Sequence, residues 1–392
     1  MIDKVSVERC VLCKACSDAC PTKAIQFTKE YCGFQYPQIN SGKCIGCNRC
    51  ETVCPTFQKI PSKTIKPQAF AAMNIKPDIR LSSTSGGVFT ALSEYVLNLG
   101  GFICGAIFSE GFSVKHIVTN KHQDLAKMRG SKYVQSDTTG IYPEVKKILD
   151  SGVYVLFSGC PCQIAALKSY LNCEYDNLLC VDVICHGIPG ESSWKTYMAL
   201  QEEKYKGKII DVDFRNKAYG WHRSSMRLTF DHNHIYQEPI TSDYYYYYGF
   251  LGNIFLKESC YHCQFRDFKS GSDITLGDFW GAEVSLSAFD DNKGLSTVLV
   301  HTKKGKRLFE QLPLDRVKVD IDTILSGNRN IIESPPKSAI RTAYYEYVKV
   351  HGEGNAMKKY LQENPLVSIK RKTHYMLRKC KHFLQGKKEP LY

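Results

Sequence analysis

Eight cysteines near the N-terminus follow one spacing twice, and this spacing points directly to a chemistry. The first copy, C-x2-C-x2-C-x3-C-P, runs from Cys10 to Pro21, and the second runs from Cys44 to Pro55. In this bacterial dicluster pattern, the first three cysteines of each copy bind one [4Fe–4S] cluster, and the fourth binds the other cluster. The spacing assigns one cluster to Cys10, Cys13, Cys16 and Cys54, and the other to Cys44, Cys47, Cys50 and Cys20.

The spacing has a physical reason. Three thiolates placed two residues apart fit a tight loop around three corners of a cubane. The proline after each fourth cysteine turns the chain away from the metal and removes one amide hydrogen. Zinc sites favour paired C-x2-C units with a longer gap between them, and disulfide frameworks are typical of small secreted chains. The eight cysteines therefore predict two [4Fe–4S] clusters and an electron-carrying protein.

A second group of cysteines is dispersed through the rest of the chain. Cys162 follows a strand-like apolar run, in Ser158-Gly159-Cys160-Pro161-Cys162-Gln163, at the expected start of a helix, where a thiolate is stabilised. With three cysteines further along, it would complete a four-thiolate set for a third cluster: Cys162, Cys185, Cys260 and Cys263. Buried free thiols, a zinc site or a redox pair of Cys160 and Cys162 are alternatives that the spacing leaves open. We expect the others to be packing residues: Cys32, Cys104, Cys173, Cys180 and Cys380.

Three further features have both a functional and a structural interpretation. The run from Leu81 to Gly87 is rich in serine and glycine and precedes an expected helix, which suits either a phosphate group or a simple helix cap. The sequence contains neither a G-x-G-x-x-G fingerprint nor a P-loop. Tyr244 to Tyr248 could stack on a planar cofactor, although packing is the simpler explanation. His186 and His222 could shuttle protons or be structural.

Alternating strand and helix patterns position these residues in an α/β body. Strands are expected over 101–108, 112–118, 153–157 and 178–184, and helices over 88–99, 142–149, 164–171 and 193–204. Strand patterns at 209–230 and 296–300 indicate a second mixed lobe. The expected fold class is an α+β ferredoxin-like dicluster module followed by an α/β body that carries this lobe.

The expected domain organisation follows from these patterns. A 2[4Fe–4S] ferredoxin domain would span residues 1–58, and a linker with two prolines and three lysines would span 59–67. The body would divide into an N-terminal part at 68–205 and a C-terminal part at 206–325. A basic, largely helical tail would follow at 326–392; its last 26 residues contain eight Lys or Arg and one acidic residue.

Bulk composition limits the location and the partners. The formal charge is +13, but because each cluster with four thiolates carries about −2, three clusters would reduce it to about +7. Much of the remainder lies in the tail, so nucleic acid is not an expected partner, whereas the tail could touch an anionic membrane surface. A signal peptide and a long apolar span are both lacking, and thiolate-bound clusters need reducing conditions, which predicts a cytoplasmic protein.

Taken in order, these motifs resemble the coenzyme F-420 hydrogenase/dehydrogenase beta-subunit family, with a bacterial-type ferredoxin domain at the N-terminus. The resemblance covers roughly residues 1–325. It rests on the cysteine run together with an ordered set of segments: Ser83–Gly87, Arg129–Ser136, Ser158–Gln163, Ile184–Gly187, Cys260-x2-Cys263 and Asp273–Gly281.

The resemblance implies a flavoprotein that contains FAD. By position, flavin contacts would come from Ser85, Gly86, Gly87, Ser131, Lys132 and Tyr133. The cluster nearest the flavin would be bound by Cys162, Cys185, Cys260 and Cys263. Cys160 departs from the family pattern and could displace one of these ligands or be an independent thiol.

The implied activity is that of an oxidoreductase. Electrons would pass between FAD, which exchanges a hydride with a small molecule such as coenzyme F-420, and clusters that serve a ferredoxin or another redox protein. The alternative is a flavin-free iron–sulfur electron-transfer subunit that docks a separate catalytic chain. Catalytic residues, the substrate, the direction of electron flow and the oligomeric state are not defined by the sequence.

Overall fold

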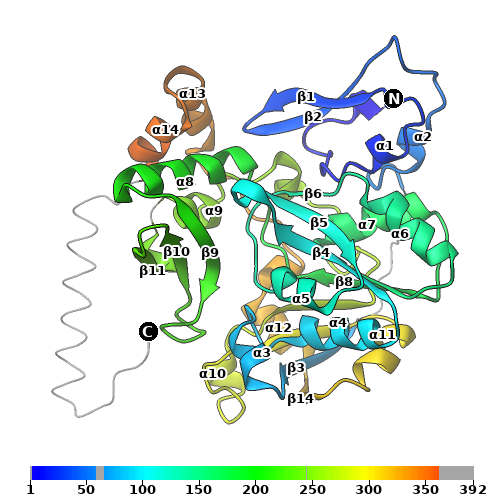
Figure 1. Ribbon diagram of the computed structural model, residues 1–392, viewed down its shortest axis with the longest axis vertical. Helices are drawn as coiled ribbons and strands as arrows, with labels where there is room; N and C mark the ends of the chain where they lie inside the picture. The colour runs from blue at the N-terminus through cyan, green and yellow to red at the C-terminus, as the bar shows by residue number, and fades with distance from the viewer. Residues whose placement is uncertain (1, 59–65, 244, 362–392) are drawn as a thin grey trace. The chain divides into compact units, whose positions relative to one another are not determined.

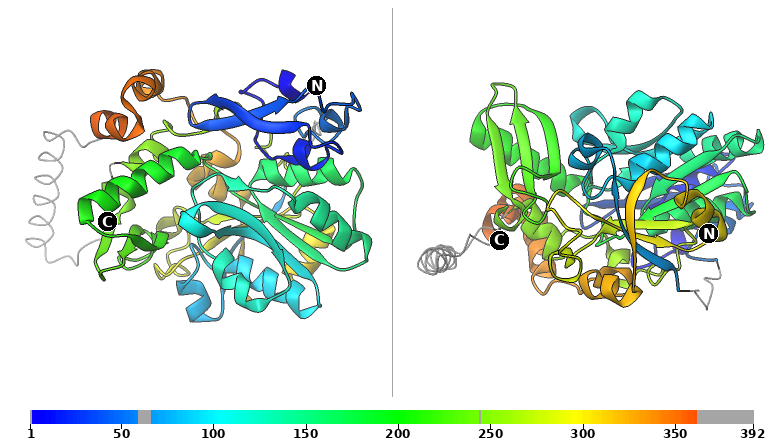
Figure 2. Two further views of the ribbon diagram at one scale, coloured as in Figure 1. Left: turned by 45° about the horizontal axis from the view of Figure 1, so that its top comes forward. Right: turned by 90° about the horizontal axis from the view of Figure 1, so that it is seen from below.

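A computed structural model describes residues 2–58, 66–243 and 245–361. The described residues divide into two compact units: the larger comprises those within 2–192 and 255–336, and the smaller comprises those within 193–254 and 337–361 (Figures 1 and 2). Within the described ranges, every helix is too short or too polar to cross a bilayer.

The N-terminal part of the larger unit consists of two cysteine loops and a hairpin. β1 (Ile25–Tyr31) pairs antiparallel with β2 (Phe34–Ile39). Short helices follow the second cysteine of each copy, namely α1 (Ala15–Asp18) and α2 (Arg49–Thr52). Lys14 and Asn48, which precede these helices, both have left-handed backbones, with φ of 61° and 56°. The sequence repeat is therefore also a repeat of backbone conformation, in loops bent tightly enough to gather three thiols.

A nine-stranded mixed sheet forms the centre of the larger unit (Figure 1). Its order across the sheet is β14 (Leu314–Val319), β3 (Gln68–Asn74), β13 (Ser296–Val300), β12 (Ile274–Asp278), β8 (Leu178–Val183), β7 (Val155–Gly159), β4 (Phe102–Phe108), β5 (Val114–Thr119) and β6 (Ser136–Asp137). Strands β12, β8, β7 and β4 are mutually parallel, and β3 runs in the same direction because it is antiparallel to β13. All five therefore end at the same edge of the sheet.

Helices cover both faces of this sheet. α4 (Val88–Asn98) connects β3 to β4, whereas α7 (Pro161–Leu171) connects β7 to β8 in the opposite direction across the sheet. Because crossovers between parallel strands are right-handed, the two helices lie on opposite faces (Figure 1). α5 (His122–Met128) and α11 (Lys303–Phe309) share the core on the α4 face, and α6 (Ile141–Asp150) packs beside α7. The crossover direction reverses between β4 and β7, where doubly wound sheets bind ligands.

The remaining elements of the larger unit are short. They are α3 (Pro77–Leu81), α10 (Ala282–Ser285), α12 (Ile321–Gly327), and the 3-10 helices η1 (Ile2–Lys4), η2 (Glu110–Phe112), η4 (Glu258–His262) and η5 (Arg329–Ile331).

The smaller unit is built on a three-stranded antiparallel sheet of β9 (Ile209–Asn216), β10 (Ser225–Phe230) and β11 (Ile235–Pro239). Its helices are most of α8 (Glu191–Tyr205), α9 (Tyr246–Leu251), α13 (Arg341–His351), α14 (Glu353–Tyr360) and η3 (Ile240–Ser242). Trp194 packs against Phe214 and Tyr246, with ring centroids 4.8 and 5.0 Å apart. Tyr246 and Tyr247 are fully buried, so these members of the tyrosine run pack in a core.

Most expected elements are present, and one was assigned to the wrong place. Residues 296–300 were expected in a second lobe with 209–230, but they form β13, inside the nine-stranded sheet and hydrogen-bonded to β3 and β12. An all-apolar run predicts that a strand is buried, but it does not indicate which sheet the strand joins. The expected linker lies mostly outside the described residues, as do Cys380 and the tail beyond Leu361.

Candidate functional site

The thiols of the first dicluster set lie close together and are largely buried. Cys13, Cys16 and Cys54 are buried, and Cys10 is partly buried. Burial raises the pKa of Cys13, and repulsion from the neighbouring Cys16, Cys54 and Cys10 raises it further. Burial likewise raises the pKa of Cys10 to about 11. Thiols that repel one another when ionised are close together, and a multivalent cationic centre would remove that repulsion.

The second dicluster set lines a single cavity. Its walls include all four cysteines that the spacing assigns to this cluster: Cys20, Cys44, Cys47 and Cys50. Cys20 comes from the first copy of the motif and the other three from the second. The cavity therefore brings the fourth cysteine of the first copy beside the first three of the second copy, as a crossed ligand set would require.

A third cysteine-lined cavity lies in the body of the larger unit. Cys162 follows β7 at the start of α7, and Cys185 follows β8, so both lie at the edge where the parallel strands end. Cys260 and Cys263 come from η4 and its C-terminal boundary. All four proposed ligands line this cavity. Burial raises the pKa of Cys162 to about 12, with further contributions from Cys263, Cys185 and Cys260.

Two buried cations accompany this third set. Arg266 lines the same cavity and is 7 % exposed. Its guanidinium donates to the carbonyl oxygens of His186 (2.8 Å) and Asn330, while its buried Nε–H has no hydrogen-bond partner among the described residues. Lys257, which is 1 % exposed, is the second cation. An orphaned donor beside a cysteine-lined cavity fits an anionic, sulfur-rich group, so the residues fit a [4Fe–4S] cluster.

Cys160 lies beside the third set but does not line its cavity. Its thiol is hydrogen-bonded to Cys185, and this bond, more than the nearby Arg266 and Lys257, lowers the pKa of Cys185 to about 7. Cys160 is also the N-cap of α7, and its backbone N–H donates to the side-chain oxygen of Gln163 at 2.8 Å. This placement favours a structural role next to the proposed ligands.

The Ser-Gly-Gly loop lies at the same edge of the sheet, between α3 and α4. The Ser85 hydroxyl donates to the carbonyl oxygen of Leu295 (2.6 Å), and the Gly86 N–H donates to Ser296 Oγ (2.9 Å). Gly86 fits closely against β3: a Cβ there would lie 2.4 Å from the backbone oxygen of Ala72. Gly87 is the N-cap of α4, with φ of 82°.

The Ser131-Lys132-Tyr133 segment contacts this loop. The Ser131 N–H donates to Thr84 Oγ1 at 2.8 Å, and the two hydroxyl oxygens are 3.1 Å apart. Lys132 Nζ donates to the carbonyl oxygens of Arg129 (3.0 Å) and Gly130 (3.2 Å) and lies 5.6 Å from the ring centroid of Phe108, at the end of β4. Both segments proposed to contact a flavin therefore meet at one edge of the sheet.

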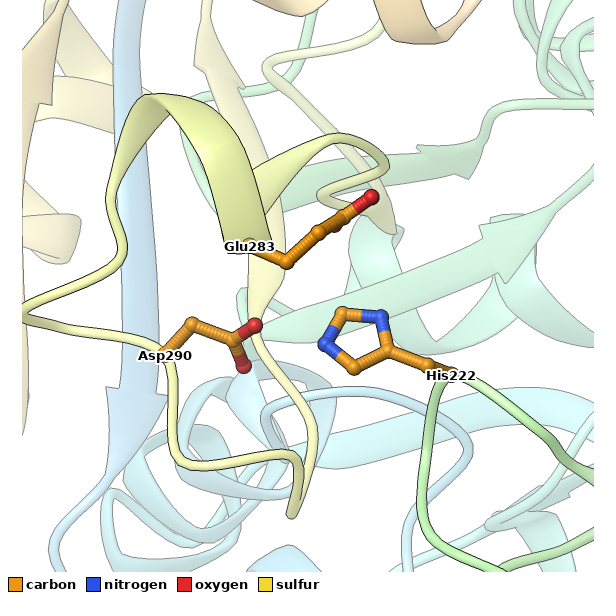
Figure 3. A group of neighbouring side chains, drawn as sticks. All are labelled: His222, Glu283 and Asp290. Atoms are coloured by element: carbon orange, nitrogen blue, oxygen red, sulfur yellow. The ribbon is translucent and has the colours of Figure 1, made fainter. Parts of the chain in front are cut away.

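The two histidines considered as proton carriers, His186 and His222, lie in different compact units. His186 follows Cys185, and its Nδ1 is 3.3 Å from Asn330 Nδ2. Figure 3 draws His222 with Glu283 and Asp290. Glu283, in α10, and Asp290 belong to the larger unit, whereas His222 belongs to the smaller one.

Sequence reasoning missed the two buried cations and the contact made by Thr84. Lysine and arginine are rarely fully buried, and nothing in the local pattern marks Lys257 or Arg266 as an exception. The only available signal is proximity in sequence, since Lys257 and Arg266 flank the Cys260-x2-Cys263 pair.

Comparison with known proteins adds independent information. Residues 9–57 match a 4Fe-4S dicluster domain, and residues 153–322 match the model for the C terminus of the beta subunit in coenzyme F420 hydrogenase/dehydrogenase. A chain of the xenon-derivatised F420-reducing [NiFe] hydrogenase complex from Methanosarcina barkeri is similar at 16 % identity and a TM-score of 0.46, over 74 % of this chain and 96 % of that chain. The search of curated proteins gave no significant match. The chain therefore carries a 4Fe-4S dicluster domain at residues 9–57, and its residues 153–322 match the C-terminal domain of the coenzyme F420 hydrogenase/dehydrogenase beta subunit.

Proposed function

We propose that this chain is an iron–sulfur flavoprotein oxidoreductase that contains FAD and three [4Fe–4S] clusters. The observation that carries the proposal is the shared edge of the sheet. The Cys162 and Cys185 loops leave this edge, as does the Ser85–Gly87 loop, which follows β3, and all four body cysteines line one cavity. In doubly wound sheets, ligands bind outside the carboxyl ends of the strands, near the reversal of the crossovers.

The proposed roles divide by residue type. Cysteines would hold the clusters, and the buried Lys257 and Arg266 would offset the negative charge of the cluster in the body. The Ser85–Gly87 loop, together with Ser131, Lys132 and Tyr133, would contact the flavin, with Lys132 providing a positive charge beside it. When bound, FAD exchanges a hydride and the clusters exchange single electrons, so the chain would join two-electron and one-electron chemistry.

The substrate and partner follow by analogy with the family. A small hydride donor or acceptor of the coenzyme F-420 type would react at the flavin, and a ferredoxin-type protein would exchange electrons at the N-terminal clusters. The cytoplasm is the proposed location because thiolate-bound clusters need reducing conditions.

A flavin-free electron-transfer subunit is the second candidate, and one observation favours it. The Ser85 hydroxyl, the Gly86 N–H and Lys132 Nζ all have hydrogen-bond partners within the chain, so the loop is satisfied without a flavin.

An anaerobic dye-reduction assay distinguishes the two candidate functions. Protein reconstituted with iron, sulfide and FAD is mixed with reduced coenzyme F-420 and an oxidised viologen dye. The proposal predicts dye reduction that requires FAD. Protein that takes up no FAD and reduces no dye, although its clusters are intact, would contradict it and support the second candidate, which needs a separate catalytic chain to accept the hydride.

A further inference from the structure

Lys257 occupies a position that the cysteine motifs do not explain. It precedes Cys260 by three residues, and its side chain is 1 % exposed. The backbone is fixed on both sides, because the Lys257 N–H donates to Ile188 O and the Cys260 N–H donates to Lys257 O, each at 2.9 Å. A fully buried lysine is rare and costly unless compensating groups surround it.

The ammonium group reaches into the first dicluster loop. Lys257 Nζ donates to Val11 O at 2.6 Å and to Gln135 Oε1 at 3.0 Å. Val11 lies between Cys10 and Cys13, two proposed ligands of the first cluster. These bonded partners of Nζ are neutral, so neither of them cancels the positive charge.

The thiols around Lys257 belong to two different sites. Burial lowers the pKa of Lys257, but the charge interactions with Cys162, Cys260, Cys160 and Cys10 oppose burial, and the pKa lies above its ordinary value. Three of these residues belong to the body and Cys10 belongs to the dicluster module, and all lie in the larger unit.

We propose that Lys257 is a buried cation shared by the first dicluster site and the third cysteine site, and that it sets the reduction potentials of both. The inference rests on the third cluster of the proposed function. A nearby positive charge in a medium of low dielectric stabilises the reduced form of a cluster, which carries one more negative charge than the oxidised form. Lys257 thus raises both potentials above the values that a neutral residue at this position would give, and its hydrogen bond to Val11 O joins the two sites.

The test is a redox titration followed by electron paramagnetic resonance. Signals are assigned by their loss in Cys13→Ser for the first cluster and in Cys263→Ser for the third. Lys257→Gln and Lys257→Met remove the charge, and only glutamine retains a donor for Val11 O. Both should lower the midpoint potentials of the first and third clusters, each by at least about a tenfold change in the one-electron equilibrium, or about 59 mV. Lys257→Arg should restore most of the shift.

Two further variants separate charge from packing. Gln135→Glu places a carboxylate on Lys257 Nζ without removing the lysine, and it should lower the same two potentials. Lys43→Gln neutralises an exposed lysine beside Cys44 and should have a smaller effect, because solvent screens its charge. Iron content reports whether each variant retains its clusters.

The outcomes distinguish this inference from the proposed function. Wild-type protein could contain about 12 iron atoms per chain while the midpoint potentials stay unchanged in Lys257→Gln and Gln135→Glu. That result would overturn the role of Lys257 and leave the proposed function standing. A wild-type value near about 8 would remove the third cluster and both proposals with it.

Discussion

The third cysteine-lined cavity is formed by residues from three separate segments: Cys162, Cys185, Cys260 and Cys263. Beside them lies the Arg266 Nε–H, which has no hydrogen-bond partner among the described residues. For single residues, what could be predicted from the sequence depends on whether the ligands of a site lie close together in the chain. The eight N-terminal cysteines carry their geometry in their spacing, because the ligands of each loop are local. The body cysteines carry no such information, and Lys257 and Arg266 carry none at all, because burial depends on the fold.

Replacing Cys263 with serine should remove one cluster. Total iron should fall from about 12 to about 8 atoms per chain, since each cluster holds four. Iron and acid-labile sulfide in anaerobically purified protein measure the change. Cys173→Ser is the matched control, because Cys173 is exposed and lies outside the three cysteine sets; it should retain all of the iron. Unchanged iron in the Cys263 variant would refute its assignment as a ligand.

Cys160→Ser should keep the third cluster. The side chain does not line the cysteine cavity, and serine is an effective N-cap for α7, so neither iron content nor stability should fall appreciably. Cys162→Ser, two residues away, should lose about four iron atoms. The reverse pattern, with iron lost only from the Cys160 variant, would make Cys160 the fourth ligand.

At the scale of elements, the sequence predicted the individual strands and helices well, because apolar runs and 3.6-residue periodicity are local signals. β7, β8 and α4 lie within two residues of their expected bounds. The pairing of β13 with β3 joins segments more than 200 residues apart in the chain, and no local signal encodes such a contact. The same limit applies to the Ser131 contact with Thr84.

Gly86→Ala should destabilise the sheet. The added methyl group would lie 2.4 Å from Ala72 O and 2.8 Å from Ser296 N, which are backbone atoms of β3 and β13. Overpacking of this kind typically costs about 1–3 kcal/mol, so the melting temperature should fall. Gly354→Ala in α14 is the control: its nearest neighbours are 3.8 Å away, and it should be neutral or slightly stabilising. Equal melting temperatures for wild type and the Gly86 variant would show that β3 and β13 are not packed this closely.

The histidine on β5 should make stability depend on pH. Burial lowers the pKa of His116 from 6.5 to about 4, and its ring bonds Ser136 Oγ (2.6 Å) and Ser158 O (3.1 Å). Neutral His116 contributes fully to the free energy of unfolding above pH 6.5, and this contribution is lost between pH 6.5 and 4. In that range the unfolded chain binds a proton at this histidine and the folded chain does not.

Between about pH 7.5 and 5.5, this effect should cost about 1.4 kcal/mol of unfolding free energy. Urea titrations of wild type and His116→Asn measure it, and the variant should lose that share of the pH dependence. His122→Asn, at an exposed site at the start of α5, should behave as wild type. A His116 variant with undiminished pH dependence would contradict the assignment.

At the scale of the whole molecule, cysteine sites and the Ser-Gly-Gly loop converge within the larger unit, while the smaller unit has its own aromatic core. Residues 9–57 match a 4Fe-4S dicluster domain, and residues 153–322 match the C-terminal domain of the coenzyme F420 hydrogenase/dehydrogenase beta subunit. The sequence could indicate this type because its motifs occur in a fixed order. It could not identify the substrate, since recognition of a small molecule depends on side chains that only the assembled edge of the sheet brings together.

We propose that one chain holds both a flavin and three clusters. Anaerobic purification, followed by release and identification of any flavin, allows flavin and iron per chain to be measured in the same sample. The protein should contain close to one FAD and about 12 iron atoms per chain. Protein that holds no flavin, even after reconstitution with FAD, and only about 8 iron atoms would contradict this proposal.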